Sequence, residues 1–75
     1  MRALVTGAAG FVGQWTCQAL LRDGWAVTGA ALEGIPSSGT LSADDRARVD
    51  WVAGDLRDDS VLESLLDRRP DAILH

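Results

Sequence analysis

Apolar runs and helical stripes alternate along this chain of 75 residues. A short apolar run at residues 2–6 ends in glycine, which predicts a buried parallel strand. From residue 11 the period becomes helical, with one apolar stripe made of Val12, Trp15, Thr16, Ala19 and Leu20. Gly24 is placed to end this helix. The first part of the chain is therefore predicted to be a strand, a tight turn and a helix.

The middle of the chain predicts two more strands separated by a loop. Residues 26–30 form the second strand, and Gly29 inside it indicates a close backbone approach. Residues 33–45 are rich in Gly, Pro, Ser and Asp, which predicts a loop or a poorly formed helix. Residues 49–53 form the third strand.

The last part of the chain predicts a second helix and the start of a fourth strand. Ser60 and Glu63 have the spacing of a capping box, and Pro70 ends the helix. Residues 71–75 then begin a strand. Strands that alternate with helices imply right-handed crossovers and a parallel sheet, so the expected fold class is α/β.

Composition and charge narrow the kinds of partner. The chain is 47% hydrophobic and 24% charged, which is typical of a globular domain. The net charge is −4 and there is no cluster of positive charge, so we expect neither a nucleic-acid nor a membrane partner. Because the chain is shorter than the usual ~100–200 residues of a domain, residues 1–75 are expected to be part of one.

The single cysteine and the N-terminal residues bear on the compartment. One cysteine, Cys17, excludes an internal disulfide framework and favours a reducing compartment, and we read Cys17 as a packing residue. The apolar run at the N-terminus is too short for a signal peptide or a membrane span. The cytoplasm is therefore the expected location.

Three glycines stand between the first strand and the first helix. Gly7 lets the chain turn sharply, Gly10 lets a pyrophosphate approach the backbone, and Gly13 lets the helix pack tightly on the sheet. The free N–H groups of Phe11 and Val12 then point at the anion. The alternative is a tight turn that binds no ligand. The strand before the turn and the helix after it favour the phosphate site.

Three segments together carry a family resemblance. The sequence Val-Thr-Gly-Ala-Ala-Gly-Phe-Val-Gly at residues 5–13 resembles the start of the extended short-chain dehydrogenase/reductase family, which includes nucleotide-sugar epimerases, dehydratases and ketoreductases. Residues 54–58 resemble the family's turn after the third strand, and residues 70–75 resemble its fourth strand. The resemblance covers the whole chain. It implies a Rossmann-type doubly wound parallel sheet, of which residues 1–75 are the N-terminal portion, β-α-β-loop-β-α-β.

The resemblance also implies a cofactor and its contacts. The cofactor would be NAD or NADP, with its pyrophosphate lined by Gly7, Gly10, Phe11 and Val12. Asp55 would accept a hydrogen bond from the adenine amino group, and the backbone N–H of Leu56 would meet the adenine ring. The alternative for Asp55 is a turn or cap residue.

The chain departs from the family pattern at the end of the second strand. NAD-specific members carry an acid at the position of Ala31, where it grips the ribose hydroxyls. Glu33 could substitute if the loop bends back, or it is a solvated loop carboxylate. No arginine follows before Arg46 to hold a 2′-phosphate. The choice between NAD and NADP stays open at this point.

The chain contains no Tyr and no Lys, so it lacks the family's catalytic Tyr-x-x-x-Lys pair. We therefore expect no catalytic residue and no metal site here, and a structural role for the lone histidine, His75. One hypothesis is a longer parent enzyme, a homodimer, that transfers a hydride at a sugar carbon of a nucleotide-linked sugar. The other is a non-catalytic dinucleotide-binding module used in redox sensing or as a scaffold. A Tyr-x-x-x-Lys further along the parent would distinguish them.

Overall fold

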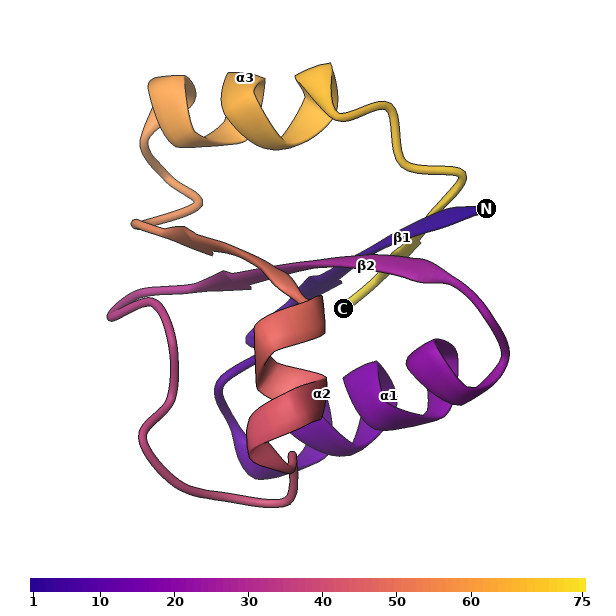
Figure 1. Cartoon of the computed structure of the whole chain (residues 1–75). Helices are drawn as coiled ribbons and strands as arrows, with labels where there is room; N and C mark the ends of the chain where they lie inside the picture. The colour runs from indigo at the N-terminus through magenta and orange to yellow at the C-terminus, as the bar shows by residue number, and fades with distance from the viewer.

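The computed structural model describes all 75 residues as strands alternating with helices (Figure 1). Their bounds are β1 Arg2–Thr6, α1 Phe11–Arg22, β2 Ala26–Ala31, α2 Ala43–Arg48, β3 Asp50–Ala53, α3 Asp59–Asp67 and β4 Ala72–Leu74. The four strands form one parallel sheet in the order β3-β2-β1-β4. The predicted Rossmann-type α/β fold is thereby confirmed.

The direction of the crossovers sets the layers of the fold. The chain passes from β1 through β2 to β3 in one direction and then returns to β4 on the other side of β1. Right-handed crossovers therefore place α1 and α2 on one face and α3 on the opposite face. Figure 1 shows α3 above the sheet and α1 and α2 below it. The strand order thus reverses between β1 and β4.

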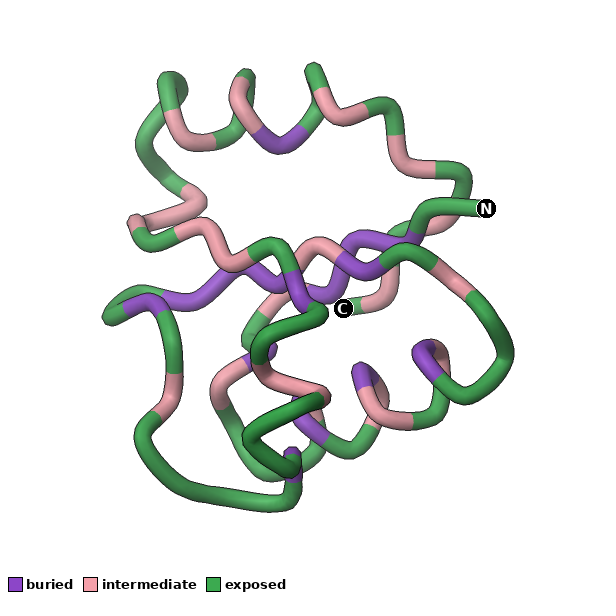
Figure 2. The backbone as a smooth tube through the Cα atoms, in the orientation of Figure 1, coloured by how far each residue is buried: buried purple, intermediate pink, exposed green.

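The core lies on both faces of the two central strands. Side chains alternate along β1, so Val5 packs with Cys17 under α1 while Leu4 packs with Leu65 of α3. The buried positions in Figure 2 gather on β1, on β2 and on the inner turns of α1. These buried strands carry the turns of the candidate site at their carboxyl ends.

Gly29 lies where β2 is packed most closely. A Cβ at this position would lie 3.0 Å from the Ala8 Cβ, from the Trp51 Cζ3 and from the Val49 Cγ1. Contacts this short leave little room for a side chain. The close approach predicted from the glycine inside the strand is therefore confirmed.

The apolar stripe predicted for α1 is not the side that is buried. The residues of α1 that are buried are Gln14, Cys17 and Leu21, whereas Val12 is 71% exposed and Trp15 is 63% exposed. α1 carries apolar residues on two adjacent sides, and periodicity alone does not say which side meets the sheet. The side with the smaller Cys17 packs against the core.

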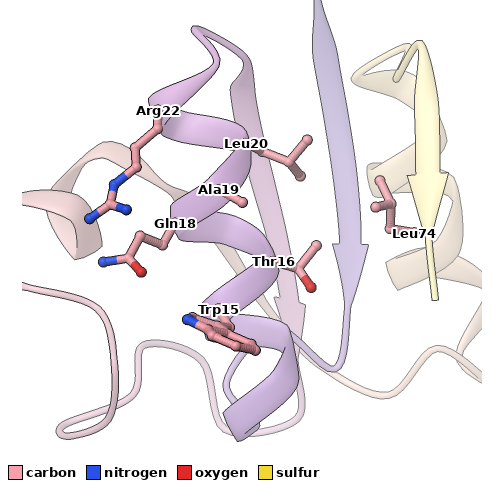
Figure 3. A pocket seen from close by; sticks show the side chains of 7 residues that line it. All are labelled: Trp15, Thr16, Gln18, Ala19, Leu20, Arg22 and Leu74. Carbon is pink, nitrogen blue, oxygen red and sulfur yellow. The ribbon is translucent and has the colours of Figure 1, made fainter.

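The exposed side of α1 borders an open groove beside β4. The groove has a cavity volume of about 370 Å³ and is lined by Trp15, Thr16, Gln18, Ala19, Leu20, Arg22 and Leu74. In Figure 3, Thr16 and Leu20 point from α1 towards the side on which Leu74 of β4 lies. β4 has β1 as its one neighbour in the sheet, so the other edge of β4 is unpaired.

A buried glutamine, Gln14, joins α1 to the long loop after β2. Its Nε2 donates to the Ala9 carbonyl at 2.8 Å and to the Ser38 carbonyl at 3.1 Å. Its Oε1 accepts from the Leu41 N–H at 3.3 Å. These bonds satisfy the amide and allow a polar residue into the core. Gln14 is not part of the apolar stripe predicted for this helix, so the sequence analysis did not anticipate its burial.

The segment predicted as a loop or a poorly formed helix, residues 33–45, is a loop that runs into a short helix. Helix α2 begins at Ala43, because the Ser42 hydroxyl caps it by accepting from the Asp45 N–H at 3.1 Å. The Arg48 Nη1 lies 3.7 Å from the Asp45 Oδ1, which pairs the two ends of the helix. The Ser-x-x-Asp spacing was the signal for this helix start.

The capping box predicted at Ser60 and Glu63 is wrong. Helix α3 begins at Asp59, and its cap is Asp58, whose Oδ1 accepts from the Ser60 N–H at 2.9 Å and from the Ser60 hydroxyl at 2.7 Å. Those two hydrogen bonds hold the pKa of Asp58 below its ordinary value of 3.8. An ionised carboxylate is a strong acceptor at a helix start, so the helix begins earlier than the serine alone would place it.

We expect Cys17 to be unreactive in the folded protein. Its side chain is fully buried, and this burial raises the pKa of the thiol to about 11 because the thiolate loses its hydration. The thiolate is the reactive form. A thiol reagent at neutral pH should therefore modify Cys17 much more slowly in native protein than in urea, measured as reagent absorbance against time. Equal rates in both states would contradict the packing role.

Candidate dinucleotide site at the carboxyl edge of the sheet

The turn from β1 into α1 is built around closely packed glycine backbone. Gly7 has a φ of +62°, a left-handed conformation that suits glycine. A Cβ at Gly13 would lie 2.1 Å from the Gly7 carbonyl oxygen, so the first turn of α1 presses directly against the loop. At Gly10 the same oxygen would be 3.3 Å away. The packing of the turn thus excludes a side chain at Gly13 far more strongly than at Gly10.

The N-terminus of α1 differs from those of the other helices. Side chains of Ser42 and Asp58 cap α2 and α3, whereas Gly10 offers α1 no side-chain cap. The N–H groups of the first turn, including those of Phe11 and Val12, have no partner within the helix. Both residues are largely exposed. Open N–H groups at the positive end of the helix dipole favour an anion.

Two cavities flank this turn, one on each side. The first, of about 320 Å³, lies at the ends of β1, β2 and β3 and is lined by Gly7, Ala30, Ala31, Leu32, Gly54, Asp55, Leu56 and Arg57. The second, of about 350 Å³, lies between β1 and β4 and is lined by Val5, Thr6, Gly7, Val12, Gly13, Thr16, Leu74 and His75. Gly7 lines both. The pair sits where the strand order reverses, which is where open α/β sheets bind ligands.

Asp55 in the first cavity is held by Arg57. The Arg57 Nε donates to both carboxylate oxygens at 3.1 Å, and its Nη2 donates to Oδ2 at 2.7 Å. The backbone N–H of Arg57 also donates to Oδ1 at 2.9 Å. The side-chain bonds from Arg57 are the main reason why the pKa of Asp55 lies below its ordinary value of 3.8. The cavity therefore presents an ionised, oriented acceptor at neutral pH.

A polar contact lies at the β4 side of the second cavity. The Thr6 hydroxyl lies 2.6 Å from the His75 Nδ1 and 3.4 Å from the Leu74 carbonyl oxygen. These contacts join the end of β4 to the end of β1. The structural role expected for His75 stays a prediction.

The predicted site residues fall into three places. Gly7, Asp55 and Leu56 line the first cavity, and Val12 lines the second together with Gly7. Gly10 and Phe11 lie at the N-terminus of α1 and line neither cavity.

The first cavity also contains a residue that the sequence analysis did not single out. Ala31 lines this cavity, but Glu33 does not and is exposed on the loop. Arg57 does line it. The signal for Arg57 was its position two residues after Asp55, where a turn brings the two side chains together.

The parallel sheet, its crossovers and the glycine turn define a Rossmann-type α/β protein. The model of the NAD dependent epimerase/dehydratase family matches residues 3–75, so the chain belongs to that family. A UDP-glucose 4-epimerase from Mycolicibacterium smegmatis is 36% identical over 76 aligned positions, which cover 100% of this chain and 24% of that protein. The crystal structure of a Burkholderia cenocepacia J2315 protein assigned as an epimerase has a TM-score of 0.73 at 30% identity, over 96% of this chain and 23% of that one.

The chain thus spans about a quarter of the length of these relatives. None of its helices has the length and apolar character needed to span a bilayer.

Proposed function

We propose that residues 1–75 form the N-terminal part of a single NAD(P)-binding domain in a longer parent enzyme. The observation that carries this proposal is the pair of cavities that meet at Gly7, beside the uncapped N-terminus of α1. A dinucleotide has the matching form, since two nucleosides are joined by a pyrophosphate. The pyrophosphate would cross the glycine turn and leave one nucleoside on each side of it.

Each proposed contact follows from the chemistry of the groups present. The pyrophosphate would lie against the backbone of Gly7 and Gly10 and accept from the N–H groups of Phe11 and Val12. Adenine would lie in the first cavity, where Asp55 accepts from its exocyclic amine. The backbone N–H of Leu56, the residue after Asp55, would meet the ring. The nicotinamide half would enter the second cavity.

The parent would act on a nucleotide-linked sugar by hydride transfer at a sugar carbon. When bound, the nicotinamide supplies the hydride acceptor or donor, while the residues of this chain bind and orient the dinucleotide. Support for the substrate class comes from the Mycolicibacterium relative, which is named as a UDP-glucose 4-epimerase. Because the chain has no Tyr and no Lys, we assign the acid/base residues to the rest of the parent.

The test of this function uses the full-length parent. Titration calorimetry should record one dinucleotide bound per subunit, and incubation with a UDP-hexose should give a new sugar signal in NMR spectra. Binding without turnover, in a parent that lacks Tyr-x-x-x-Lys, would support the non-catalytic module instead. Absence of dinucleotide binding would refute the proposal as a whole.

We expect Asp55→Ala to weaken dinucleotide binding several-fold through its effect on adenine. Nicotinamide hypoxanthine dinucleotide carries a carbonyl in place of the amine, so it loses nothing when the acceptor is removed. The measurement is the Kd of the wild type and of the variant for both dinucleotides. Asp44→Ala, which removes an exposed carboxylate from α2, is the control. Equal weakening for both dinucleotides would leave Asp55 with a structural role in the turn.

Two further expectations about the parent, the homodimer and the cytoplasmic location, stay predictions. Size-exclusion chromatography with light scattering would measure the first, and cell fractionation would measure the second.

A further inference from the structure

The part of the first cavity formed by the end of β2, where the adenine ribose would lie, has no carboxylate to accept hydrogen bonds from the ribose hydroxyls. The end of β2 contributes Ala31 and Leu32 to the cavity lining, and neither can accept a hydrogen bond through its side chain. Glu33 lies outside the lining. Asp55 is the one acid that lines the cavity, and it lies on the turn after β3 and not at the end of β2. The acid that usually recognises the free 2′-hydroxyl of NAD at this end of β2 is therefore missing.

The same cavity contains one cation, Arg57. Its side chain is 91% exposed, so the guanidinium faces solvent at the mouth of the cavity. All of its side-chain hydrogen bonds run through Nε and Nη2. The Nη1 amino group is therefore left to donate to a ligand while the pair with Asp55 stays intact.

Two other arginines, neither of which lines this cavity, are engaged elsewhere. The Arg46 Nη1 donates to the Pro36 carbonyl at 3.0 Å, and the Arg68 Nε donates to the Asp50 Oδ2 at 2.6 Å. Arg57 is thus the cation placed to meet a negative group in this cavity. A planar guanidinium is also the side chain best matched to a phosphate, because its N–H groups diverge in a fork.

We propose that Arg57 recognises a 2′-phosphate on the adenine ribose, so that the site selects NADP over NAD. The inference rests on the proposed function, because it assigns the adenosine half of the dinucleotide to the first cavity. Asp55 fixes the guanidinium in that cavity, and Nη1 donates to the phosphate oxygens. The attraction acts near the surface, so the preference for NADP weakens as salt is added.

The closing experiment measures four affinities in the full-length parent by titration calorimetry. The ligands are NADP⁺ and NAD⁺, together with 2′,5′-ADP and 5′-AMP, which differ from each other by the 2′-phosphate alone. We expect the phosphorylated member of each pair to bind at least tenfold more tightly. Arg57→Gln should remove most of that preference, measured as the ratio of the two Kd values, while the loss of the side-chain partner of Asp55 weakens the binding of both dinucleotides by a common factor. Arg57→Lys, which keeps the charge, should retain part of the preference.

Arg22→Gln is the matched control, because Arg22 is an exposed arginine on α1 that lines neither of the two cavities. Equal affinity of the wild-type protein for NADP⁺ and NAD⁺ would overturn the inference and leave the proposed function standing. A parallel loss of both affinities in Arg57→Gln, with the ratio of the two Kd values unchanged, would make Arg57 only a positioning residue for Asp55 and would also overturn the inference. A parent protein that binds neither NADP⁺ nor NAD⁺ would overturn the proposed function itself.

Discussion

Gly13→Ala in the full-length parent is expected to lower the free energy of unfolding by about 3 kcal/mol, at the upper end of the usual cost of overpacking. The new Cβ would lie 2.1 Å from the Gly7 carbonyl oxygen and 2.7 Å from the Ala8 Cα. Both are backbone atoms and cannot rotate away, so α1 must move off the turn. The measurement is the urea midpoint and slope followed by circular dichroism.

Gln18→Ala is the control for this variant. Gln18 lies on the same helix but on the side that borders the open groove, so its truncation should change the free energy of unfolding by no more than about 0.5 kcal/mol. Dinucleotide binding should fall together with stability in Gly13→Ala, since the helix start moves with the turn. A Gly13→Ala protein with an unchanged urea midpoint would show that the turn is not packed as described.

Gly10→Val is expected to have a different effect from Gly13→Ala: the protein should still fold, but it should bind the dinucleotide more weakly. Gly10 has φ −72° and ψ 169°, an extended conformation that valine adopts readily. Its Cβ would lie 3.3 Å from the Gly7 carbonyl oxygen, a contact that a shift of a few tenths of an ångström relieves. The methyl groups would occupy the space that the pyrophosphate needs. We expect the Kd for the dinucleotide to rise at least tenfold, roughly 1.4 kcal/mol.

Titration calorimetry measures this effect, and the circular dichroism spectrum of Gly10→Val checks that the fold is kept. Gly10→Ala, which adds one methyl group, should have a Kd for the dinucleotide between those of the wild type and Gly10→Val. A folded Gly10→Val protein that binds with unchanged affinity would remove Gly10 from the phosphate site. These two expected outcomes would separate two roles that a glycine motif combines: packing of the helix at Gly13 and access for the ligand at Gly10.

The fold was largely predictable because its signals are local. Apolar runs, helical periods and the glycine turn lie within short windows, and the handedness of crossovers then determines how the strands assemble. The helix starts were less predictable. Asp58 and Ser60 compete for one cap, and the choice depends on which side chain reaches which N–H group. The buried side of α1 depends on neighbours that periodicity does not contain.

The sequence predicted the residues at the turns of the candidate site but missed one residue that lines the first cavity. Gly7 and Asp55 follow from motifs, since each motif lies at the end of one strand. Arg57 does not, because its relevance arises only where the end of β2 and the turn after β3 border one cavity. The first arginine after β2 in the sequence is Arg46, and its Nη1 donates to the Pro36 carbonyl. Arg57, for which we propose contact with a 2′-phosphate, lies in the turn after β3.

The position of β4 beside β1 has a consequence for the order of folding. Ala3 pairs with Val27 of β2 and with Ala72 of β4, so the second pairing closes a far longer stretch of chain. Loop-closure entropy makes the longer closure costlier by about 1 kcal/mol. The cavity on the β2 side should therefore form before the cavity on the β4 side. Pulse-labelling hydrogen exchange during refolding would record this as protection of β2 amides ahead of β4 amides, and simultaneous protection would exclude it.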